Sequence, residues 1–338
     1  MLITRAELRR LLLAQQGLLD GRLPGSPVSW IARRGFLQLD WQTHALASGH
    51  DLVLADRLQG YQVGDLDVAL YNGSQLFEHC LHVPGALPAA AYSLIYDNEA
   101  IAAASGAGSP GRRILQLLSG EGALSQHELQ GILQREGWHE RRTVEQAIHQ
   151  LFASGAILVR HREASLRTYD LAERVLPHSV HRLVALSRPE RQRALTLLAL
   201  HILAPVSRAT WSQALNGIGS RAKLDLAAMK RDKNNLITEL VAQGKAEQLD
   251  VENPLQRYYV PADWLSGSER RAYALAPRVH FLSSIDPLVW DRQRTLDLFG
   301  FDCRRQAQAY RSPERQPLSD YVLPILYGEA LVGRMAPR

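Results

Sequence analysis

Cysteine is scarce in this chain, since only Cys80 and Cys303 occur among its 338 residues. The two lie far apart, and neither belongs to the Cys-x-x-Cys spacing that zinc sites and redox motifs use. A pair of distant cysteines also excludes the dense disulfide framework of a small secreted domain. The sequence therefore implies no metal centre, and its cysteine usage suits a reducing compartment.

Long hydrophobic runs are missing as well. The leucines at 11–13 follow three arginines within residues 5–10, and glutamines at 15–16 end the apolar stretch. Such a segment is too short to span a membrane, and it lacks the cleavage site of a secretory leader. We expect a soluble protein that contacts no membrane and stays in the cytoplasm.

The excess of positive over negative charge is small. Lys and Arg number 39 and Asp and Glu number 34, which gives a formal net charge of +5. This balance neither demands nor excludes a polyanionic partner, because most surface charges only keep a protein hydrated. A nucleic-acid interpretation must depend on where the basic residues stand. The length suffices for about two or three modules.

What the chain does contain is a repeated order of elements. Residues 144–151 have apolar side chains at the i, i+3, i+4, i+7 spacing of one helix face, and Gly155 supplies the stop. A strand at 157–159, a polar turn and a second strand at 167–171 follow. The same order returns with a helix at 236–241, a glycine at 244 and two further strands.

Each copy is preceded by a shorter helix with a start signal. Ser125 to Glu128 has the Ser-x-x-Glu form of a capping box, and Ser207 is the equivalent cap in the second copy. Helix, helix, strand, wing and strand is the plan of the winged helix-turn-helix, whose second helix can lie in a DNA major groove.

A third, more divergent copy is predicted at the start of the chain. Thr4 to Glu7 is again a capping box, and residues 30–35 read as a helix end with Gly35 as its stop. Aligning Gly35 with Gly155 places residues 38–40 on the first strand of a wing. In an extended backbone, side chains at i and i+2 share one face, so Gln38 and Asp40 would converge there.

We therefore predict an α+β fold with three tandem winged helix-turn-helix modules and a small C-terminal α/β element. Small residues at 102–111 and a Ser-Arg-Pro break at 186–190 mark the junctions. The predicted bounds are 1–105, 106–186 and 187–277 for the three modules and 278–338 for the element, in which 321–326 is a strand.

Two segments carry a family resemblance. One is Leu37-Gln38-Leu39-Asp40; the other is residues 285–292, Ile-Asp-Pro-Leu-Val-Trp-Asp-Arg, followed by Leu-Phe-Gly-Phe at 298–301. Together they resemble the paired signatures of the bacterial winged-helix DNA glycosylases of the AlkZ/YcaQ-like family, which excise alkylated purines and unhook interstrand crosslinks. The resemblance extends from residue 3 to residue 334.

The resemblance implies that Gln38 and Asp40 are catalytic. A purine alkylated at N7 leaves as a neutral base, so it needs little acid assistance; a carboxylate can stabilise the oxocarbenium-like sugar and take a proton from water. The amide of Gln38 can hold that water. No lysine stands in a motif for a Schiff base, so a monofunctional glycosylase is expected. In the alternative interpretation, Asp40 and Gln38 are solvated residues at a strand end.

Three other residues are possible parts of a lesion site. Glu78 and His82 match the family's Glu-x-x-x-His segment, although such a histidine is more often a hydrogen-bonded structural residue. Asp286 belongs to a segment that the family places near DNA, and the alternative is an internal Asp/Arg pair. We favour a structural role for Asp291 and leave Asp286 open.

Basic residues recur beside the predicted recognition helices, where they suit contacts with DNA phosphates. They are Arg33, Arg34, Arg141, Arg142, Arg221, Lys223, Lys230, Arg231 and Lys233.

The chain also departs from the family pattern. Ser48-Gly49-His50 stands where relatives place an arginine and paired histidines, Val83 replaces an acidic residue, and relatives continue past residue 338. Missing C-terminal strands would leave a sheet edge open. A weaker enzyme, a narrower enzyme and a truncated paralogue all remain open.

The expected partner is double-stranded DNA with alkylated bases or crosslinks, bound by a monomer near the nucleoid, with no cofactor and no metal. The alternative is a non-catalytic winged-helix protein, either a transcriptional regulator or an inactivated glycosylase paralogue. Against a regulator, there is no ligand-sensing motif and no dimerisation helix, and tandem unlike wings suit wrapping DNA better than reading a palindrome.

Overall fold

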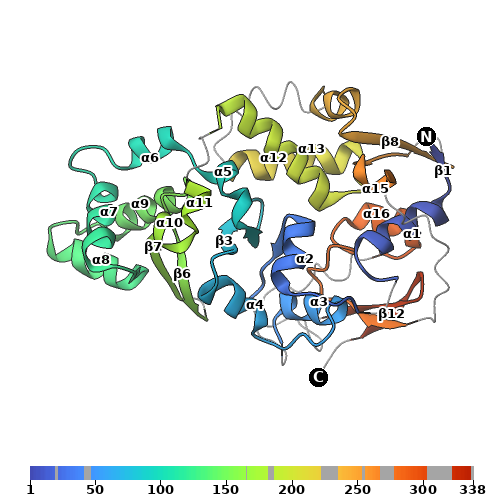
Figure 1. The fold of residues 1–338 in the computed structure, drawn as a ribbon, viewed down its shortest axis with the longest axis horizontal. Coiled ribbons are helices and arrows are strands. Elements are labelled where there is room, and N and C mark those ends of the chain that lie inside the picture. The colour runs from blue at the N-terminus through green and yellow to red at the C-terminus, as the bar shows by residue number, and fades with distance from the viewer. Residues whose placement is uncertain are drawn as a thin grey trace, which may run out of the picture.

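The computed structural model is a mixed α+β protein in which short helices surround small sheets (Figure 1). Four three-stranded sheets occur among the described residues. The structure describes residues 1–19, 22–41, 47–164, 166–181, 186–221, 235–252, 256–266, 278–302 and 322–335.

The first sheet has the strand order β2-β4-β3, with antiparallel neighbours. Helix α2 precedes it; it begins with a Ser26 cap and Pro27 at its first position, and it ends at Gly35, whose φ of 81° suits glycine. The elements are α2 (Pro27–Arg34), β2 (Leu37–Gln38), α3 (Gly49–Arg57), α4 (Asp65–Asp67), η1 (Val68–Asn72), β3 (Leu76–Cys80) and β4 (Pro84–Pro88).

The second sheet repeats this order as β5-β7-β6. The predicted capping box at Ser125 is confirmed, and Gly155 has a φ of 76° after the predicted helix. The elements from the first sheet onward are η2 (Ala89–Ala91), α5 (Tyr92–Ile95), α6 (Asn98–Ala104), α7 (Pro110–Glu121), β5 (Leu124–Ser125), α8 (Gln126–Arg135), α9 (Arg141–Ala153), β6 (Ile157–Glu163), β7 (Leu166–Leu171), α10 (Ala172–Val175) and α11 (His178–His181).

The third sheet unites distant parts of the chain. Strand β1 pairs in parallel with β8, so the first strand belongs to this sheet and not to the first module, where the sequence placed it. Ser207 accepts a hydrogen bond from the N–H of Thr210 at 3.2 Å, as expected of a cap. The elements are β1 (Leu2–Ile3), α1 (Arg5–Gln15), α12 (Arg188–Leu203), α13 (Arg208–Arg221), β8 (Ala246–Val251), β9 (Arg257–Pro261) and α15 (Asp263–Ser266).

The fourth sheet is the predicted C-terminal element. A turn at Gly328, with a φ of 57°, joins its last two strands, and Arg10 of α1 donates to Glu329 in that turn at 2.7 Å. Figure 1 shows this sheet and α1 at the end of the molecule opposite α7 and α8. The elements are β10 (Val279–Phe281), α16 (Arg292–Phe299), β11 (Leu323–Tyr327) and β12 (Ala330–Met335).

The strand order shows that the alignment of Gly35 with Gly155 is wrong. Strand β2 is an edge strand paired with β4, and the hairpin of this sheet is β3–β4. Helix α7 also ends at a glycine, Gly122, two residues before an edge strand, so Gly35 corresponds to Gly122. Gln38 therefore matches Ser125 at the end of an edge strand, because Gln38 faces Gly85 and Ser125 faces Thr168.

One apolar core joins the first two sheets. Leu37 and Leu39 belong to the same buried cluster as residues of α7, α8 and α9, while β3, β4 and α1 contribute to a second cluster with the third and fourth sheets. The segment that contains Gln38 and Asp40 is thus held on its apolar side by a core shared between modules. None of the helices in the described ranges is long and apolar enough to cross a bilayer.

Candidate active site

The segment of Gln38 and Asp40 alternates between buried and half-buried side chains. Leu37 and Leu39 are 1% and 3% exposed, whereas Gln38 and Asp40 are half-buried. Side chains alternate across an extended backbone, so the leucines anchor the segment in the core while Gln38 and Asp40 share the other face. The alternation is the one that the sequence predicted, although the strand is not the predicted wing strand.

Gly85 permits this segment to lie close to its neighbour. A Cβ at Gly85 would stand 2.1 Å from the Phe36 ring and 2.8 Å from the Leu37 carbonyl oxygen. Both distances are below van der Waals contact, and Phe36 is buried, so the ring has little room to move. Glycine at 85 is therefore a requirement for β2 and for the position of Gln38.

His50 fixes the backbone of Asp40. The Asp40 N–H donates to Nδ1 of His50 at 3.2 Å, and His50 is 1% exposed. Burial lowers the pKa of His50, although the nearby carboxylates of Asp51 and Asp40 act in the opposite direction. Because Nδ1 accepts a hydrogen bond, the ring is neutral at neutral pH and carries its proton on Nε2.

Trp41 packs between His50 and an arginine of the second sheet. Its ring contacts the His50 ring edge-on, with centroids 4.7 Å apart, and the Arg162 guanidinium lies 4.6 Å from the Trp41 ring centroid. Asp40 and Trp41 are thus both restrained by side chains from other elements, His50 of α3 and Arg162 of β6. Nothing in the sequence near Asp40 indicates a contribution from β6.

Glu78 lies inside this second network and not on a surface. Its side chain is fully buried; it accepts hydrogen bonds from Arg162, Arg167 and the hydroxyl of Tyr71, the last at 3.0 Å. Burial alone would raise the pKa of Glu78, but the hydrogen bonds and charges of the two arginines outweigh burial and lower it. This carboxylate is ionised and paired, so its geometry favours a structural role over the predicted contact with a lesion.

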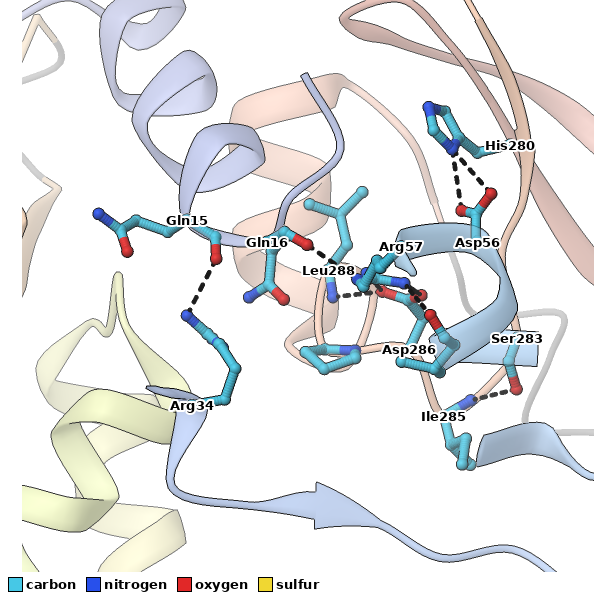
Figure 2. A network of polar contacts seen from close by, with 12 residues as sticks. Gln15, Gln16, Arg34, Asp56, Arg57, His280, Ser283, Ile285, Asp286 and Leu288 are labelled. Carbon is cyan, nitrogen blue, oxygen red and sulfur yellow. Dashed lines mark hydrogen bonds and ion pairs between the residues drawn. The ribbon is translucent and has the colours of Figure 1, made fainter. Parts of the chain in front are cut away.

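Asp286 is also an internal ion-pair partner (Figure 2). Its two oxygens accept bidentate hydrogen bonds from Arg57 of α3 at 2.8 and 2.9 Å, and both side chains are almost completely buried. Of the two roles left open for Asp286, the geometry supports the Asp/Arg pair. The same figure shows His280 of β10 beside Asp56, and their contact is 2.9 Å long. The C-terminal element thus binds two consecutive residues of α3, Asp56 through β10 and Arg57 through the segment that follows β10.

These contacts between the C-terminal element and α3 affect the candidate site, because α3 contains His50. At the start of α3, a Cβ on Gly49 would lie 3.0 Å from Ser283 Oγ and 3.1 Å from Ile285. The C-terminal element therefore packs directly against the turn that presents His50 to Asp40. Ser48, Gly49 and His50, which the sequence marked as a departure from the family, form a close-packed corner of the fold.

Two carboxylates, Asp51 of α3 and Asp67 of α4, and the phenol of Tyr61 between them form a polar group next to His50. The Tyr61 hydroxyl donates to Asp51 at 2.6 Å, and burial, followed by this hydrogen bond, raises the pKa of Tyr61. Burial and the charge of Asp51 raise the pKa of Asp67. Raised carboxyl pKa values gather at functional sites as well as in structural networks.

His82 lies against a different hollow. Its ring packs against Phe36 and Trp290, with centroids 5.6 and 4.7 Å away. It lines a cleft of about 990 Å³ between α13 and α16, whose described lining includes neither Gln38 nor Asp40. Asp291, in the same cleft, caps α16 and accepts the Thr210 hydroxyl at 2.7 Å, which is the structural role expected for it.

The predicted phosphate-binding residues divide into three groups. Arg33, Arg141 and Arg142 are exposed, and Arg141 pairs with Glu145 in the next turn of α9. Arg34 does not fit the prediction, since it is 6% exposed, donates to the Gln15 carbonyl and has a pKa lowered to about 9 by burial and then by the charge of Arg57. The side chains of Arg221, Lys223, Lys230, Arg231 and Lys233 lie outside the described residues.

Sequence reasoning missed His50, Trp41 and Arg162. His50 had a local signal, because it lies in the first turn of the helix that follows Asp40 and sits in the segment that departs from the family. Arg162 had none, since its carboxylate partner is 84 residues away. Within the described ranges, no group of three or more His, Cys, Asp and Glu side chains is arranged to hold a metal ion.

Comparison with known proteins adds a family and a fold. Residues 31–338 match the family described as DNA glycosylase AlkZ-like. Among solved structures, the chain is similar to DNA glycosylase AlkZ of Streptomyces sahachiroi, with a TM-score of 0.62 over 98% of this chain and 88% of that chain. At 12% sequence identity, this second likeness concerns the fold alone.

Proposed function

The chain belongs to the AlkZ-like DNA glycosylase family, and we propose that it hydrolyses the N-glycosidic bond of cationic N7-alkylated purines in duplex DNA. The observation that supports this most is the pairing of two half-buried polar side chains, Gln38 and Asp40, on one face of a segment whose backbone is fixed by a neutral histidine. Catalytic groups need such restraint.

In the proposed reaction, Asp40 acts on a water molecule. The bond from the sugar C1′ to the purine N9 breaks, and its electron pair neutralises the cationic base, which departs without added acid. The Asp40 carboxylate stabilises the positive charge that develops on the sugar. Water then bonds to C1′ and its proton passes to Asp40, as in an inverting glycosidase.

Gln38 is the proposed partner that orients this water. A side-chain amide both donates and accepts, so it can hold a water without taking its proton. The amide thus leaves Asp40 as the base. Because water is the nucleophile, the product is an abasic site, which makes the enzyme monofunctional.

Crosslinked purines fit the same proposal. Gln38 and Asp40 are half-buried, so both residues keep some access to solvent. A base tied to the opposite strand cannot be flipped into a closed pocket. A site with solvent access does not require such flipping, so we include unhooking of interstrand crosslinks in the proposed activity.

We further propose that DNA is bound by three winged-helix modules with the predicted bounds, except that β1 and α1 join the third and fourth sheets. The shared strand order of the first two sheets supports two of them, and the bridge between Val206 and Tyr259 beside the β8–β9 hairpin supports the third. Arg33, Arg141 and Arg142 are the described residues proposed to contact phosphates.

The proposal is tested with a duplex containing a single N7-methylguanine. The purified chain should produce an alkali-labile abasic site, and Asp40→Asn should lower the single-turnover rate at least about 100-fold. The substitution is nearly isosteric, so lesion binding and thermal unfolding should stay close to wild type. A wild-type chain that binds the duplex with strong salt dependence but releases no base would instead support the non-catalytic DNA-binding alternative.

A further inference from the structure

We propose that Arg162, in the wing strand β6 of the second sheet, is a positioning residue for the catalytic segment of the first sheet. The inference rests on the proposed role of Asp40. It adds that the second module does more than bind DNA, since it supplies part of the support on which the reaction depends.

The geometric basis is a continuous set of contacts from β6 to Asp40. The Arg162 guanidinium lies 4.6 Å from the Trp41 ring, and the Trp41 ring contacts His50 at 4.7 Å. His50 in turn accepts the Asp40 N–H at 3.2 Å. Arg162 therefore supports both the residue that follows Asp40 and the histidine that fixes its backbone.

Arg162 is itself held rigidly. Its Nε donates to one oxygen of Glu78 at 3.0 Å and its Nη2 donates to the other, while Nη1 donates to the Ala164 carbonyl. The Arg162 side chain is 5% exposed. A planar guanidinium bound through a fork has a fixed plane, which lets it stack on an aromatic ring as a lysine cannot.

The effect on catalysis follows from where the support acts. Strand β2 comprises only two residues, and Asp40 lies beyond its end, so the ladder of the first sheet does not by itself hold the carboxylate. Catalysis requires placement within about 0.5 Å. Loss of the Arg162 contact should slow base release while leaving DNA affinity nearly unchanged, because Arg162 is too buried to bind phosphate.

Arg167 provides a matched control in the same network. Its Nε donates at 3.0 Å to Glu78 Oε1, the oxygen that also accepts from Arg162 Nη2, and its Nη2 lies 2.9 Å from that oxygen as an ion-pair contact. Its guanidinium stacks on Phe152 of α9, at 5.5 Å, and not on Trp41. Arg162→Gln and Arg167→Gln thus remove the same charge from the same carboxylate, but only the first removes the contact with the catalytic segment.

The experiment compares Arg162→Gln, Arg162→Lys, Arg167→Gln and Asp40→Asn with wild type. We would measure single-turnover release of N7-methylguanine, affinity for the same duplex, and amide hydrogen exchange of residues 38–41. Arg162→Gln should slow release by about 10- to 100-fold with the affinity changed less than about threefold, and it should speed exchange at 38–41. Arg162→Lys should be slow as well, and Arg167→Gln should stay within about threefold of wild type.

Two results would overturn the inference. One is an equal slowing of base release by Arg162→Gln and Arg167→Gln, which would mean that catalysis depends on the charge pairs with Glu78 and not on the contact between Arg162 and Trp41. The other is unchanged exchange at 38–41 in both Arg162 variants. If wild type releases base, Asp40→Asn does not, and Arg162→Gln does, this inference fails and the proposed function stands. If wild type releases none, the proposed function fails, and the exchange data still decide whether Arg162 supports the segment.

Discussion

The first and second sheets share one strand order but differ in the connection after their edge strand. In the second sheet, Ser125 ends β5 and at once caps α8. In the first sheet, residues 39–48 intervene between β2 and α3, and Asp40 and Trp41 stand in this longer connection. The candidate catalytic residue Asp40 therefore lies in a connection and not in the scaffold that both sheets share.

The two connections are also stabilised by different means. In the second sheet, the side chains of Ser125 and Glu128 satisfy each other's backbone N–H groups within four residues. In the first, the support comes from His50 in the next helix and from Arg162 in the other sheet. A local cap needs no partner module, whereas the Asp40 segment depends on one.

The largest expected effect concerns the join between the two sheets. His79 of β3 donates from Nε2 to the Phe152 carbonyl of α9 at 2.9 Å, and burial lowers its pKa to about 4. The folded state therefore binds fewer protons than the unfolded chain, so the stability from His79 is full above pH 6.5 and declines as the pH falls toward 4. The loss should total roughly 3 kcal/mol, of which about 2 falls between about pH 7 and pH 5.

Urea unfolding at these two pH values measures this effect, and His79→Gln is the control. The variant should be less stable than wild type at neutral pH but should lose less stability on acidification. If wild type and variant lose the same amount, the join does not depend on a neutral His79, and the two sheets are coupled by other contacts.

A smaller effect is expected from the residues that face the two edge strands. Gly85→Ala should destabilise the protein by about 2 kcal/mol, because the new Cβ overlaps Phe36 and the Leu37 carbonyl, and it should slow base release by displacing Gln38. Thr168 occupies the matching register position opposite Ser125, and Thr168→Ala should cost less than about 1 kcal/mol. Thermal unfolding and release assays on both variants would show equal losses if the close approach at Gly85 were unimportant.

The smallest expected effect on stability concerns the two equivalent positions themselves, Ser125 and Gln38, each replaced by alanine. Ser125→Ala removes a cap and should lower the free energy of unfolding by about 1 kcal/mol, with base release per folded molecule unchanged. Gln38→Ala should leave unfolding nearly unchanged but slow release by about tenfold or more. Parallel denaturation and single-turnover assays decide the matter; a Gln38→Ala variant with wild-type kinetics would remove Gln38 from the mechanism.

Local signals allowed several of the helices to be predicted from the sequence. The capping boxes at Thr4 and Ser125 and the glycine stops at Gly35 and Gly155 are confirmed, because each depends on a few neighbouring residues. The same signals could not establish register. Gly35 and Gly122 precede edge strands, whereas Gly155 precedes a wing strand, and the three look alike in the sequence. Only the pairing of β2 with β4 shows that Gly35 corresponds to Gly122.

The partners of buried charges were beyond local reasoning. Glu78 looked like a site residue, and only the fold shows Arg162 and Arg167 enclosing it. Arg34 looked like a phosphate ligand, yet it points inward to the Gln15 carbonyl. Gln38 and Asp40 were selected by family resemblance, and their shared face followed from the period of an extended chain.

The pairing of β1 with β8 has a consequence for how the protein is made. The amino group of Met1 donates to the Gln248 carbonyl, across 247 positions of sequence. On a ribosome that adds about 5–20 residues per second, the first strand is complete on the order of ten seconds or more before its partner exists. The third sheet therefore cannot close during synthesis of the first two modules, because it needs residues 2–3 and residues 250–251 to meet.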